Sequence, residues 1–270
     1  MNILLEGGTR LQRGPKRNAP GLPLISIITA TLSVARFLPD TIRSIREQNY
    51  PNIEWIIIDG GSTDETPGLL KANEDIIDYW LSEPDGGIYD AWNKGVRLAN
   101  GDWVAFLGAG DSYLPDAVQS YADFIDKFGQ NELPEYISSR VNIVSDGQVV
   151  RTIGQPWIWK NFCKYMTVAH AGSFHHRSLF ELYGLYDTAY RICGDYELLL
   201  RPRKNLRAAF MNKVTVNMIL EGESIRNRRV FDETLRAKVS TGGRGELACQ
   251  LEKVAAIAKW KVRNLLGYWR

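Results

Sequence analysis

Residues 55–64 read Trp55-Ile56-Ile57-Ile58-Asp59-Gly60-Gly61-Ser62-Thr63-Asp64, an apolar run that stops at an acidic, glycine-rich turn. A short run of this kind, rich in β-branched residues, predicts a buried strand. Two similar runs lie before and after it, at residues 24–28 and 103–107. Between them come helical patterns from Pro39 to Asn49, at 63–70 and at 88–98, and a weaker strand at 76–81. Strands that alternate with helices predict βαβ units and a mainly parallel sheet of the α/β class.

The pattern changes after residue 112. We expect a helix near 115–128 and then two strands, at 135–144 and 148–153. Asp146-Gly147 between these strands is a hairpin signal. Short helices are expected at 178–183 and 196–201, and a longer one at 246–266. Nothing in this order of elements demands a second folding domain.

The charge of the chain is unevenly distributed. The whole chain has 33 Lys and Arg against 31 Asp and Glu, a net charge of +2. Residues 1–200 hold 17 basic and 25 acidic side chains, a net charge of −8, whereas residues 201–270 hold 16 and 6, a net charge of +10. An acidic body repels phosphate, so we expect no nucleic acid among the partners. The basic end is expected to seek an anionic surface.

Cysteine usage and hydropathy favour a cytoplasmic protein. Cys163, Cys193 and Cys249 are odd in number and lack metal-ligand spacing, which favours a reducing compartment. No apolar stretch approaches the roughly 20 residues that cross a bilayer. We therefore expect a protein that is soluble or peripheral to a membrane.

The expected helix at 246–266 has two interpretations. Its apolar side chains follow helical spacing and form one stripe: Leu247, Leu251, Val254, Ala258, Val262 and Leu265. Four basic residues lie off that stripe: Lys253, Lys259, Lys261 and Arg263. Either the helix packs on its own domain, or it lies as a basic amphipathic helix on an anionic membrane surface together with Trp260, Tyr268 and Trp269.

Small and polar residues follow three of the expected strands. They are Thr29-Ala30-Thr31, Asp59-Gly60-Gly61-Ser62-Thr63-Asp64 and Gly108-Ala109-Gly110-Asp111. In open α/β sheets, ligands bind outside the carboxyl ends of the strands. Small residues let a ligand approach the backbone, and each cluster adds a polar or acidic group. Three such clusters at one edge predict a ligand site.

Two further runs accompany these clusters: residues 82–95 (Ser-Glu-Pro-Asp-Gly-Gly-Ile-Tyr-Asp-Ala-Trp-Asn-Lys-Gly) and Ala99-Asn100-Gly101-Asp102-Trp103. Taken together, the clusters and runs resemble a family 2 glycosyltransferase over about residues 24–205. The resemblance implies a GT-A fold, which is Rossmann-like and nucleotide-binding, with a mainly parallel mixed central sheet and a C-terminal helical extension. It implies transfer from a UDP- or GDP-type nucleotide sugar to a glycan or lipid-linked acceptor with inversion. We expect a mobile basic leader at 1–23, the GT-A domain at 24–220 and a basic extension at 221–270.

The resemblance also implies roles for particular residues. Those expected to bind the nucleotide sugar are Thr29, Ala30, Thr31, Asp59, Gly60, Asp85, Asn93, Gly110 and Asp111. Asp195, within Gly194-Asp195-Tyr196-Glu197-Leu198-Leu199-Leu200-Arg201, matches the general base, and Glu197 is expected to point elsewhere. His170 is either an ordinary core or surface histidine or a residue that borders the acceptor pocket.

The expected metal site departs from the family pattern. The family usually has an acidic pair just after the fourth strand, where this chain has Gly108 and Gly110 and keeps only Asp111. A divalent cation can be held by one carboxylate, the diphosphate and water, so Asp111 is the expected ligand of Mg²⁺ or Mn²⁺.

Two alternative functions remain open. One is a non-catalytic nucleotide-sugar-binding protein, and the other is a sugar-nucleotide pyrophosphorylase, which the segment Glu6-Gly7-Gly8-Thr9-Arg10-Leu11 resembles. The expected location is the cytoplasm, at the inner face of the cytoplasmic membrane.

Overall fold

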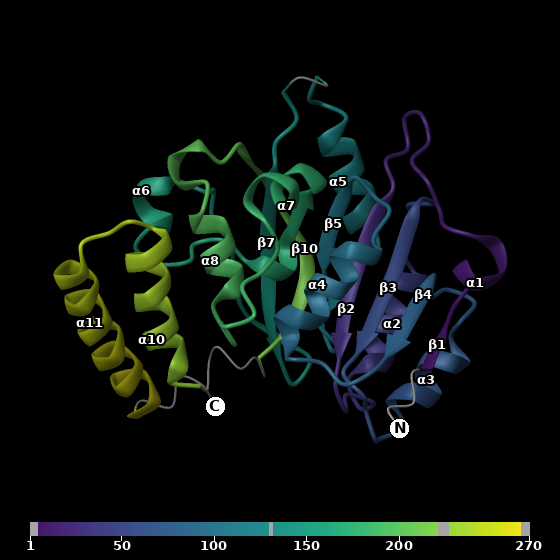
Figure 1. Cartoon of the computed structure of the whole chain (residues 1–270), viewed down its shortest axis with the longest axis horizontal. Helices are drawn as coiled ribbons and strands as arrows, with labels where there is room; N and C mark the ends of the chain where they lie inside the picture. Colours follow the sequence, from purple (N-terminus) through teal and green to yellow (C-terminus); the bar gives the residue numbers. More distant parts are fainter. Residues whose placement is uncertain (1–4, 130–131, 221–226, 266–270) are drawn as a thin grey trace.

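The computed structural model of the protein describes residues 5–129, 132–220 and 227–265. Its centre is a ten-stranded mixed sheet of order β1-β4-β3-β2-β5-β9-β7-β10-β6, with β8 paired to β7 (Figure 1). The strands are β1 (Leu5–Gly7), β2 (Ile25–Thr31), β3 (Ile53–Asp59), β4 (Tyr79–Ser82), β5 (Trp103–Phe106), β6 (Ser112–Tyr113), β7 (Tyr136–Ser145), β8 (Gln148–Ile153), β9 (Ser173–His176) and β10 (Ala208–Ile219). The helices are α1 (Arg10–Arg13), α2 (Leu38–Arg46), α3 (Thr66–Ala72), α4 (Ile88–Leu98), α5 (Ala117–Ile125), α6 (Trp159–Phe162), α7 (Arg177–Tyr183), α8 (Gly194–Leu200), α10 (Arg229–Arg236) and α11 (Glu246–Leu265).

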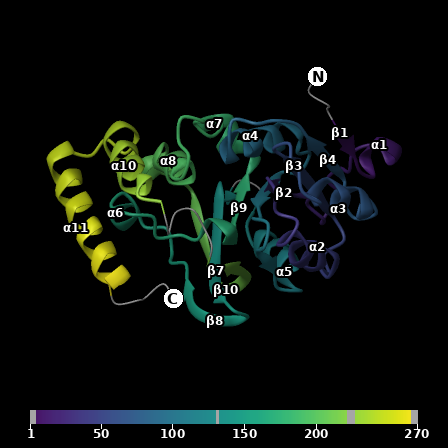
Figure 2. The ribbon, with the colours of Figure 1, turned by 90° about the horizontal axis from the view of Figure 1, so that it is seen from below.

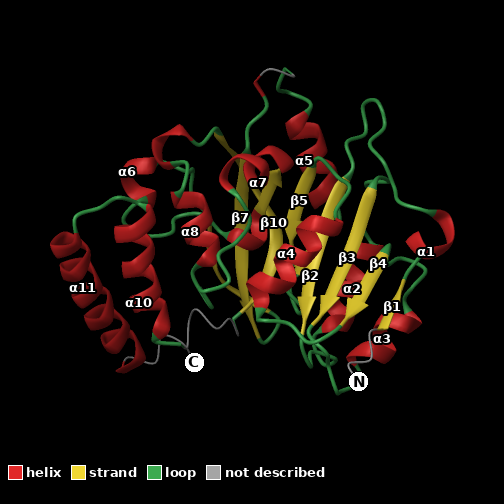
Figure 3. Cartoon of the chain, viewed as in Figure 1, coloured by secondary structure: helices red, strands yellow, loops and turns green. Residues whose placement is uncertain are grey.

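The strands β4, β3, β2 and β5 are parallel neighbours. Their arrows point to the lower edge of the sheet in Figure 3, so the loops that follow them meet there. The central strand β3 is buried along its whole length, because helices cover both faces of the sheet, and this explains its continuous apolar run. The expected α/β class, with a mainly parallel mixed sheet, is confirmed.

Two helical layers cover the sheet. Figure 2 shows α2 and α5 on one side and α4 and α7 on the other. The first layer buries Leu38, Ile42 and Tyr121 against the sheet. The second buries Tyr89, Phe180 and Leu199, among others. The second layer also contains α8, so the helix that carries Asp195 packs in the same core as β2 and β3.

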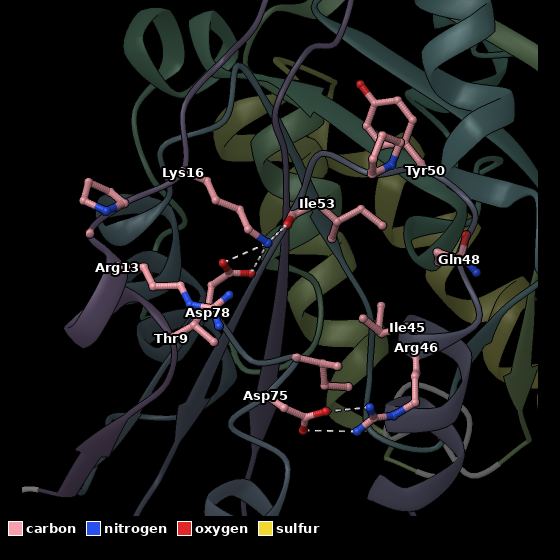
Figure 4. Close-up of a pocket in the computed structure, with 14 residues that line it drawn as sticks. Thr9, Arg13, Lys16, Ile45, Arg46, Gln48, Tyr50, Ile53, Asp75 and Asp78 are labelled. Atoms are coloured by element: carbon pink, nitrogen blue, oxygen red, sulfur yellow. Dashed lines mark hydrogen bonds and ion pairs between the residues drawn. The ribbon is translucent and has the colours of Figure 1, made fainter.

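The N-terminal segment closes one edge of the sheet. β1 pairs antiparallel with β4, and Arg10 forms an ion pair with the fully buried carboxylate of Glu54. Figure 4 shows Lys16 donating to Ile53 O (2.6 Å) and pairing with Asp78 (2.9 Å) in a pocket of about 380 Å³. Residues 5–16, which the sequence assigns to a mobile leader, therefore contact the sheet in the structure. Ile53 begins β3, so this pocket lies at the opposite end of the strands from the loops that carry the expected site.

The C-terminal extension is a helical hairpin of α10 and α11. The two helices pack through Phe231 and Trp260, whose ring centroids lie 6.1 Å apart, and Cys249 is buried. The apolar stripe of α11 faces away from this contact, with Leu247 at 77%, Leu251 at 65% and Leu265 at 86% exposure. The helix therefore packs on the protein, as the first interpretation expects, but through the face opposite its apolar stripe. Contact of the exposed stripe with a membrane stays a prediction.

Two observations bear on contact with a membrane. Within the described ranges, no helix is both long and apolar enough to span a bilayer. Of the three aromatic residues that the sequence associates with a membrane surface, Tyr268 and Trp269 lie outside the described residues. The third, Trp260, packs against Phe231, so its ring belongs to the contact between the two helices.

Candidate active site

Asp59, the last residue of β3, organises the carboxyl ends of three strands. Its carboxylate is fully buried and accepts hydrogen bonds from Thr31 Oγ1 (2.8 Å) and Ser82 Oγ (2.6 Å), which end β2 and β4. Ser62 adds its backbone N–H (2.9 Å) and its hydroxyl. Four donors match the accepting capacity of a carboxylate. Asp59 therefore fixes the loops of the site, and its direct contact with a nucleotide base stays a prediction.

The last three residues of β2 lie in different surroundings, some in the core and some at the expected donor site. Thr29 is fully buried, and its hydroxyl accepts a hydrogen bond from the indole of Trp55 at 3.0 Å. Its side chain belongs to the core, against the expectation that it contacts the nucleotide, because every second residue of a strand faces the same layer. Ala30 faces the other layer and is partly exposed. Thr31 is buried against Asp59.

Gly60 and Asp85 face each other across two strand-end loops. A side chain at Gly60 would meet Asp85 Oδ2 at 2.8 Å, so the glycine leaves the room that this carboxylate occupies. Asp85 accepts the N–H of Gly87 at 2.7 Å. Burial raises the pKa of Asp85, and the nearby negative charges of Asp90 and Asp59 raise it further. Asp85 thus lies near the buried Asp59, and the loops that carry the two residues stay the predicted nucleotide-binding loops.

Asp111 lies in the turn after β5, against the end of β10. Its Oδ1 accepts the N–H of Ile219 at 3.1 Å, and the residue is 9% exposed. Burial raises the pKa of Asp111 to about 7, opposed in part by the backbone N–H groups of Ile219 and Gly108. A nearby cation would favour the charged form of this carboxylate.

The two glycines around Asp111 pack closely against neighbouring side chains. A side chain at Gly108 would meet Asp111 Oδ2 at 2.9 Å. A side chain at Gly110, which has a φ of +95°, would meet Ile219 at 2.6 Å. A side chain at position 108 would require Asp111 to move, and one at position 110 would require Ile219 to move and a strained backbone. Among the residues that the structure describes, no group of three His, Cys, Asp or Glu side chains could hold a metal ion.

Asn93 and His170 both contact Tyr186. Asn93 is buried and forms two hydrogen bonds with the backbone of Tyr186, one to its carbonyl and one from its N–H, each of 2.9 Å. The ring of His170 stacks on Trp92 with centroids 4.8 Å apart, and its Nε2 lies 3.2 Å from the Tyr186 hydroxyl. Burial lowers the pKa of His170 to about 3, so the imidazole is neutral at pH 7. Both residues support an aromatic wall, and their contacts with sugar or acceptor stay predictions.

Asp195 is the second residue of α8. Its Oδ1 accepts the N–H of Tyr196 at 2.8 Å and lies 3.4 Å from the hydroxyl of Tyr89, which donates to Ile192 O at 2.6 Å. Burial raises the pKa of Asp195 to about 6, a suitable range for a group that takes a proton near neutral pH. Glu197 points elsewhere, as expected, because it is buried and pairs with Arg201 at 2.6 Å.

Sequence reasoning missed Arg191, which connects the segment before Asp195, the predicted base, to the predicted donor loop. Its guanidinium donates to Gly86 O, in the turn that follows Asp85. The backbone of Gly87 next to it has a φ of +110°, and a side chain there would meet Arg191 Nη1 at 2.5 Å. The available sequence signal was a basic residue four positions before Asp195 within a body of net negative charge.

Comparisons with known proteins assign this arrangement to a family. The model of glycosyl transferase family 2 matches residues 26–177, more than half of the chain. This chain belongs to glycosyltransferase family 2. A PGL/p-HBAD biosynthesis glycosyltransferase of Mycobacterium tuberculosis is 33% identical over 199 residues, which cover 68% of this chain and 71% of the relative. An uncharacterized glycosyltransferase of the same species is 35% identical over 202 residues, which cover 73% and 74%.

Solved structures confirm the GT-A fold of this glycosyltransferase. S. aureus TarS (residues 1–349), in complex with UDP-GlcNAc, matches with a TM-score of 0.66 and 16% identity over 85% of this chain and 70% of that chain. The mannosyltransferase PcManGT from Pyrobaculum calidifontis, in complex with GDP-Man and Mn²⁺, matches with a TM-score of 0.60 and 17% identity over 89% and 75%. The segment that matches the family model includes Asp59, Asp85 and Asp111 but ends before Asp195.

Proposed function

We propose that this glycosyltransferase moves a sugar, with inversion, from a UDP- or GDP-type nucleotide sugar to a hydroxyl of a glycan or lipid-linked acceptor, and that Asp195 is the general base. The observation that carries the proposal is the position of Asp195 beside the predicted donor loops. Tyr89 lies close to Asp195 Oδ1, and Arg191 joins the loop before α8 to Gly86. In this proposal, a base beside the donor loops takes the proton of the attacking acceptor hydroxyl.

The chemistry follows from the state of the Asp195 carboxylate. With a pKa of about 6, most of the carboxylate is ionised at pH 7.5 and is basic enough to accept the hydroxyl proton as the new glycosidic bond forms. The sugar leaves the nucleotide diphosphate at the same carbon, and attack from the opposite face inverts its configuration. The diphosphate carries away the electron pair of the broken bond.

The residues around Asp111 fit a divalent cation that is held in part by the donor. Asp111 is a buried carboxylate, and a bound Mg²⁺ or Mn²⁺ would supply the opposite charge that this group lacks among its described contacts. Because positions 108 and 110 are glycines and supply no second carboxylate, the diphosphate and water would complete the coordination. When bound, the cation would neutralise charge on the leaving diphosphate. The complex of PcManGT with GDP-Man and Mn²⁺ supports this proposal by analogy.

We place the acceptor at a membrane surface, on the inner face of the cytoplasmic membrane. The stripe of α11 exposes Leu247, Leu251, Val254 and Leu265, with Val262 also exposed at 53%. Lys259 and Lys261 are exposed beside it. An exposed apolar stripe flanked by cations is typical of a helix that lies on an anionic bilayer. A relative from Bacillus subtilis that is named for teichuronic acid biosynthesis, 34% identical over 106 residues, supports a role in surface-polysaccharide assembly.

The proposal also assigns a separate role to each of three segments of the chain. Residues 24–220 form the GT-A domain that binds the donor, and residues 221–270 form the extension that meets the membrane. The leader at 1–23 stabilises the sheet edge through Arg10 and Lys16.

The proposal is tested first by donor binding and then by turnover. Thermal shifts with UDP, GDP, UDP-GlcNAc and GDP-Man, each with and without Mn²⁺, identify the nucleotide. Release of nucleotide diphosphate from the sugar donor that binds is then measured for the wild type and for Asp195→Asn. A wild-type rate well above that of the variant supports the enzyme. Equal background rates, with donor bound, indicate a nucleotide-sugar-binding protein instead, the alternative that the missing acidic pair favours.

A further inference from the structure

Three consecutive backbone N–H groups directly before α8 converge on one side chain. Glu233 of α10 accepts the N–H of Arg191 on Oε1 at 3.0 Å. Its Oε2 accepts the N–H groups of Ile192 at 2.8 Å and Cys193 at 2.9 Å. These three residues lead into Gly194-Asp195, so Glu233 holds the segment that ends at the proposed base.

A carboxylate is suited to this task. It has two accepting oxygens and no donor, and hydrogen bonds to an ionised acceptor are stronger than neutral ones. A glutamine at the same place has one accepting oxygen, and its NH₂ group would face backbone N–H groups. Replacing Glu233 by Gln therefore leaves at least one of the three backbone donors unsatisfied, at little cost in side-chain volume.

The segment held by Glu233 has two further connections to the site. The side chain of Arg191 donates to Gly86 O, beside the predicted donor loop. The carbonyl of Ile192 accepts the hydroxyl of Tyr89, which also lies 3.4 Å from Asp195. Displacing residues 191–193 would therefore shift the base and the donor loop together.

Glu233 also contributes to the charge environment of Asp195. Among the described residues, the titratable groups that interact electrostatically with Asp195 include Tyr89 of α4, Tyr136 of β7, Tyr186, Cys193 and Glu233 itself. Glu233 is the acidic one among them. Burial raises the pKa of Asp195 most, hydrogen bonds from Tyr196 and Tyr89 lower it, and the charge of Glu233 adds a smaller increase. Removing this charge lowers that pKa.

We propose that Glu233 is a positioning residue for Asp195, so that α10 of the C-terminal extension is part of the catalytic unit. This inference rests on the proposed function, because it assigns Asp195 as the base. It predicts that the extension matters for turnover apart from any contact with a membrane.

The test compares Glu233→Gln with the matched control Asp232→Asn. Asp232 is the neighbouring acid on α10, is exposed, and pairs with Lys253 of α11 at 2.6 Å rather than with the loop. For each variant, kcat and KM are measured for hydrolysis of the donor identified by the thermal-shift screen. We expect Glu233→Gln to lower kcat at least about tenfold with KM changed less than about threefold, since a misplaced base slows chemistry more than donor binding. Asp232→Asn is expected to retain the wild-type values.

A second measurement needs no substrate. The carboxyl carbon of Asp195 is titrated by ¹³C NMR in protein with labelled aspartate, and its signal is assigned by its loss in Asp195→Asn. We expect the pKa of Asp195 to fall in Glu233→Gln and to stay unchanged in Asp232→Asn. Glu233→Asp keeps the charge but shortens the reach, so it should lower kcat with a smaller change in this pKa.

Two outcomes would overturn the inference, and both differ from a failure of the proposed function. An unchanged pKa of Asp195 in folded Glu233→Gln, or kcat within twofold of the wild type, would show that Glu233 does not position the base. If instead Asp195→Asn hydrolyses donor as fast as the wild type, the proposed base is wrong and Glu233 has no base to position. If Glu233→Gln fails to fold, the decisive comparison is the kcat of Glu233→Asp, and a wild-type value there overturns the inference.

Discussion

The side-chain amide of Asn93 on α4 holds the backbone of Tyr186, donating to its carbonyl and accepting from its N–H, each at 2.9 Å. The two residues are 93 positions apart in the sequence. This link fixes the segment before α8 to the helix that follows the predicted donor loop. It gives Asn93 a structural role in addition to its predicted contact with the sugar.

The first prediction separates these two roles of Asn93. Asn93→Ala removes two buried hydrogen bonds, and we expect the free energy of unfolding to fall by about 2 kcal/mol. Urea unfolding checks this, with Asn161→Ala at an exposed position as the control. Unchanged stability together with lost donor affinity would contradict the structural role and assign Asn93 to the sugar.

The second prediction concerns the ion pair between Arg10 and the fully buried Glu54. Ser26 and Asn100 also donate to this carboxylate, but Arg10 supplies the opposite charge. Arg10→Met leaves a buried charge without its partner, and we expect a loss of about 3 kcal/mol of stability by urea unfolding. Arg13→Met, an exposed position on the same helix, is the control. Equal stability of the two variants would mean that the leader does not stabilise the sheet.

The third prediction is a pH dependence. Asp195 must be ionised to accept a proton, and its pKa is raised from 3.8 to about 6 by burial. The rate of donor hydrolysis should therefore be level above about pH 7 and fall about tenfold for each pH unit below about 6. A pH–rate profile of kcat checks this. A rate that stays level down to about pH 4.5 would contradict a base with a raised pKa.

The sequence predicts those helices and strands whose own residues show a clear periodic pattern. It does not predict those that depend on pairing with distant strands. The helix expected at 88–98 and the strand expected at 148–153 are confirmed with the same bounds as α4 and β8. The strand β10 was not predicted, because its pairing with β7 shifts register twice between Phe210 and Val216, which breaks the alternation of apolar residues. The short strand β9 depends on pairing with β5 and β7, which are distant in sequence.

The candidate site likewise contains residues that local sequence patterns predict and residues that only distant packing brings together. The strand-end clusters could be found from the sequence because a parallel sheet brings them to one edge. The alternation of a strand could have placed Thr29 in the core beside Ile27 and Ile25, all three of which are fully buried. The role of Glu233 could not be predicted, since it lies 38 positions after Asp195 and meets residues 191–193 only through the packing of α10.

The fourth prediction tests the membrane contact of α11. Deleting residues 246–270 would also remove Cys249 and Trp260, which pack against the rest of the extension, so substitutions on the exposed stripe are the better test. We expect Leu251→Ser combined with Val254→Ser to lower co-sedimentation with phosphatidylglycerol vesicles about tenfold, because each side chain loses apolar area buried in the bilayer. The exposed neighbour Gln250→Ser is the control. Binding equal to that of the wild type would exclude the stripe as the membrane contact.

The central claim is that Asp195 takes the proton of the attacking hydroxyl, and donor turnover by Asp195→Asn tests it most directly. The amide keeps the size of the side chain but cannot act as the base. With donor binding confirmed by thermal shift for both proteins, we predict that nucleotide release falls about 10²-fold to 10⁴-fold in the variant. A variant rate within about threefold of the wild type would contradict the account.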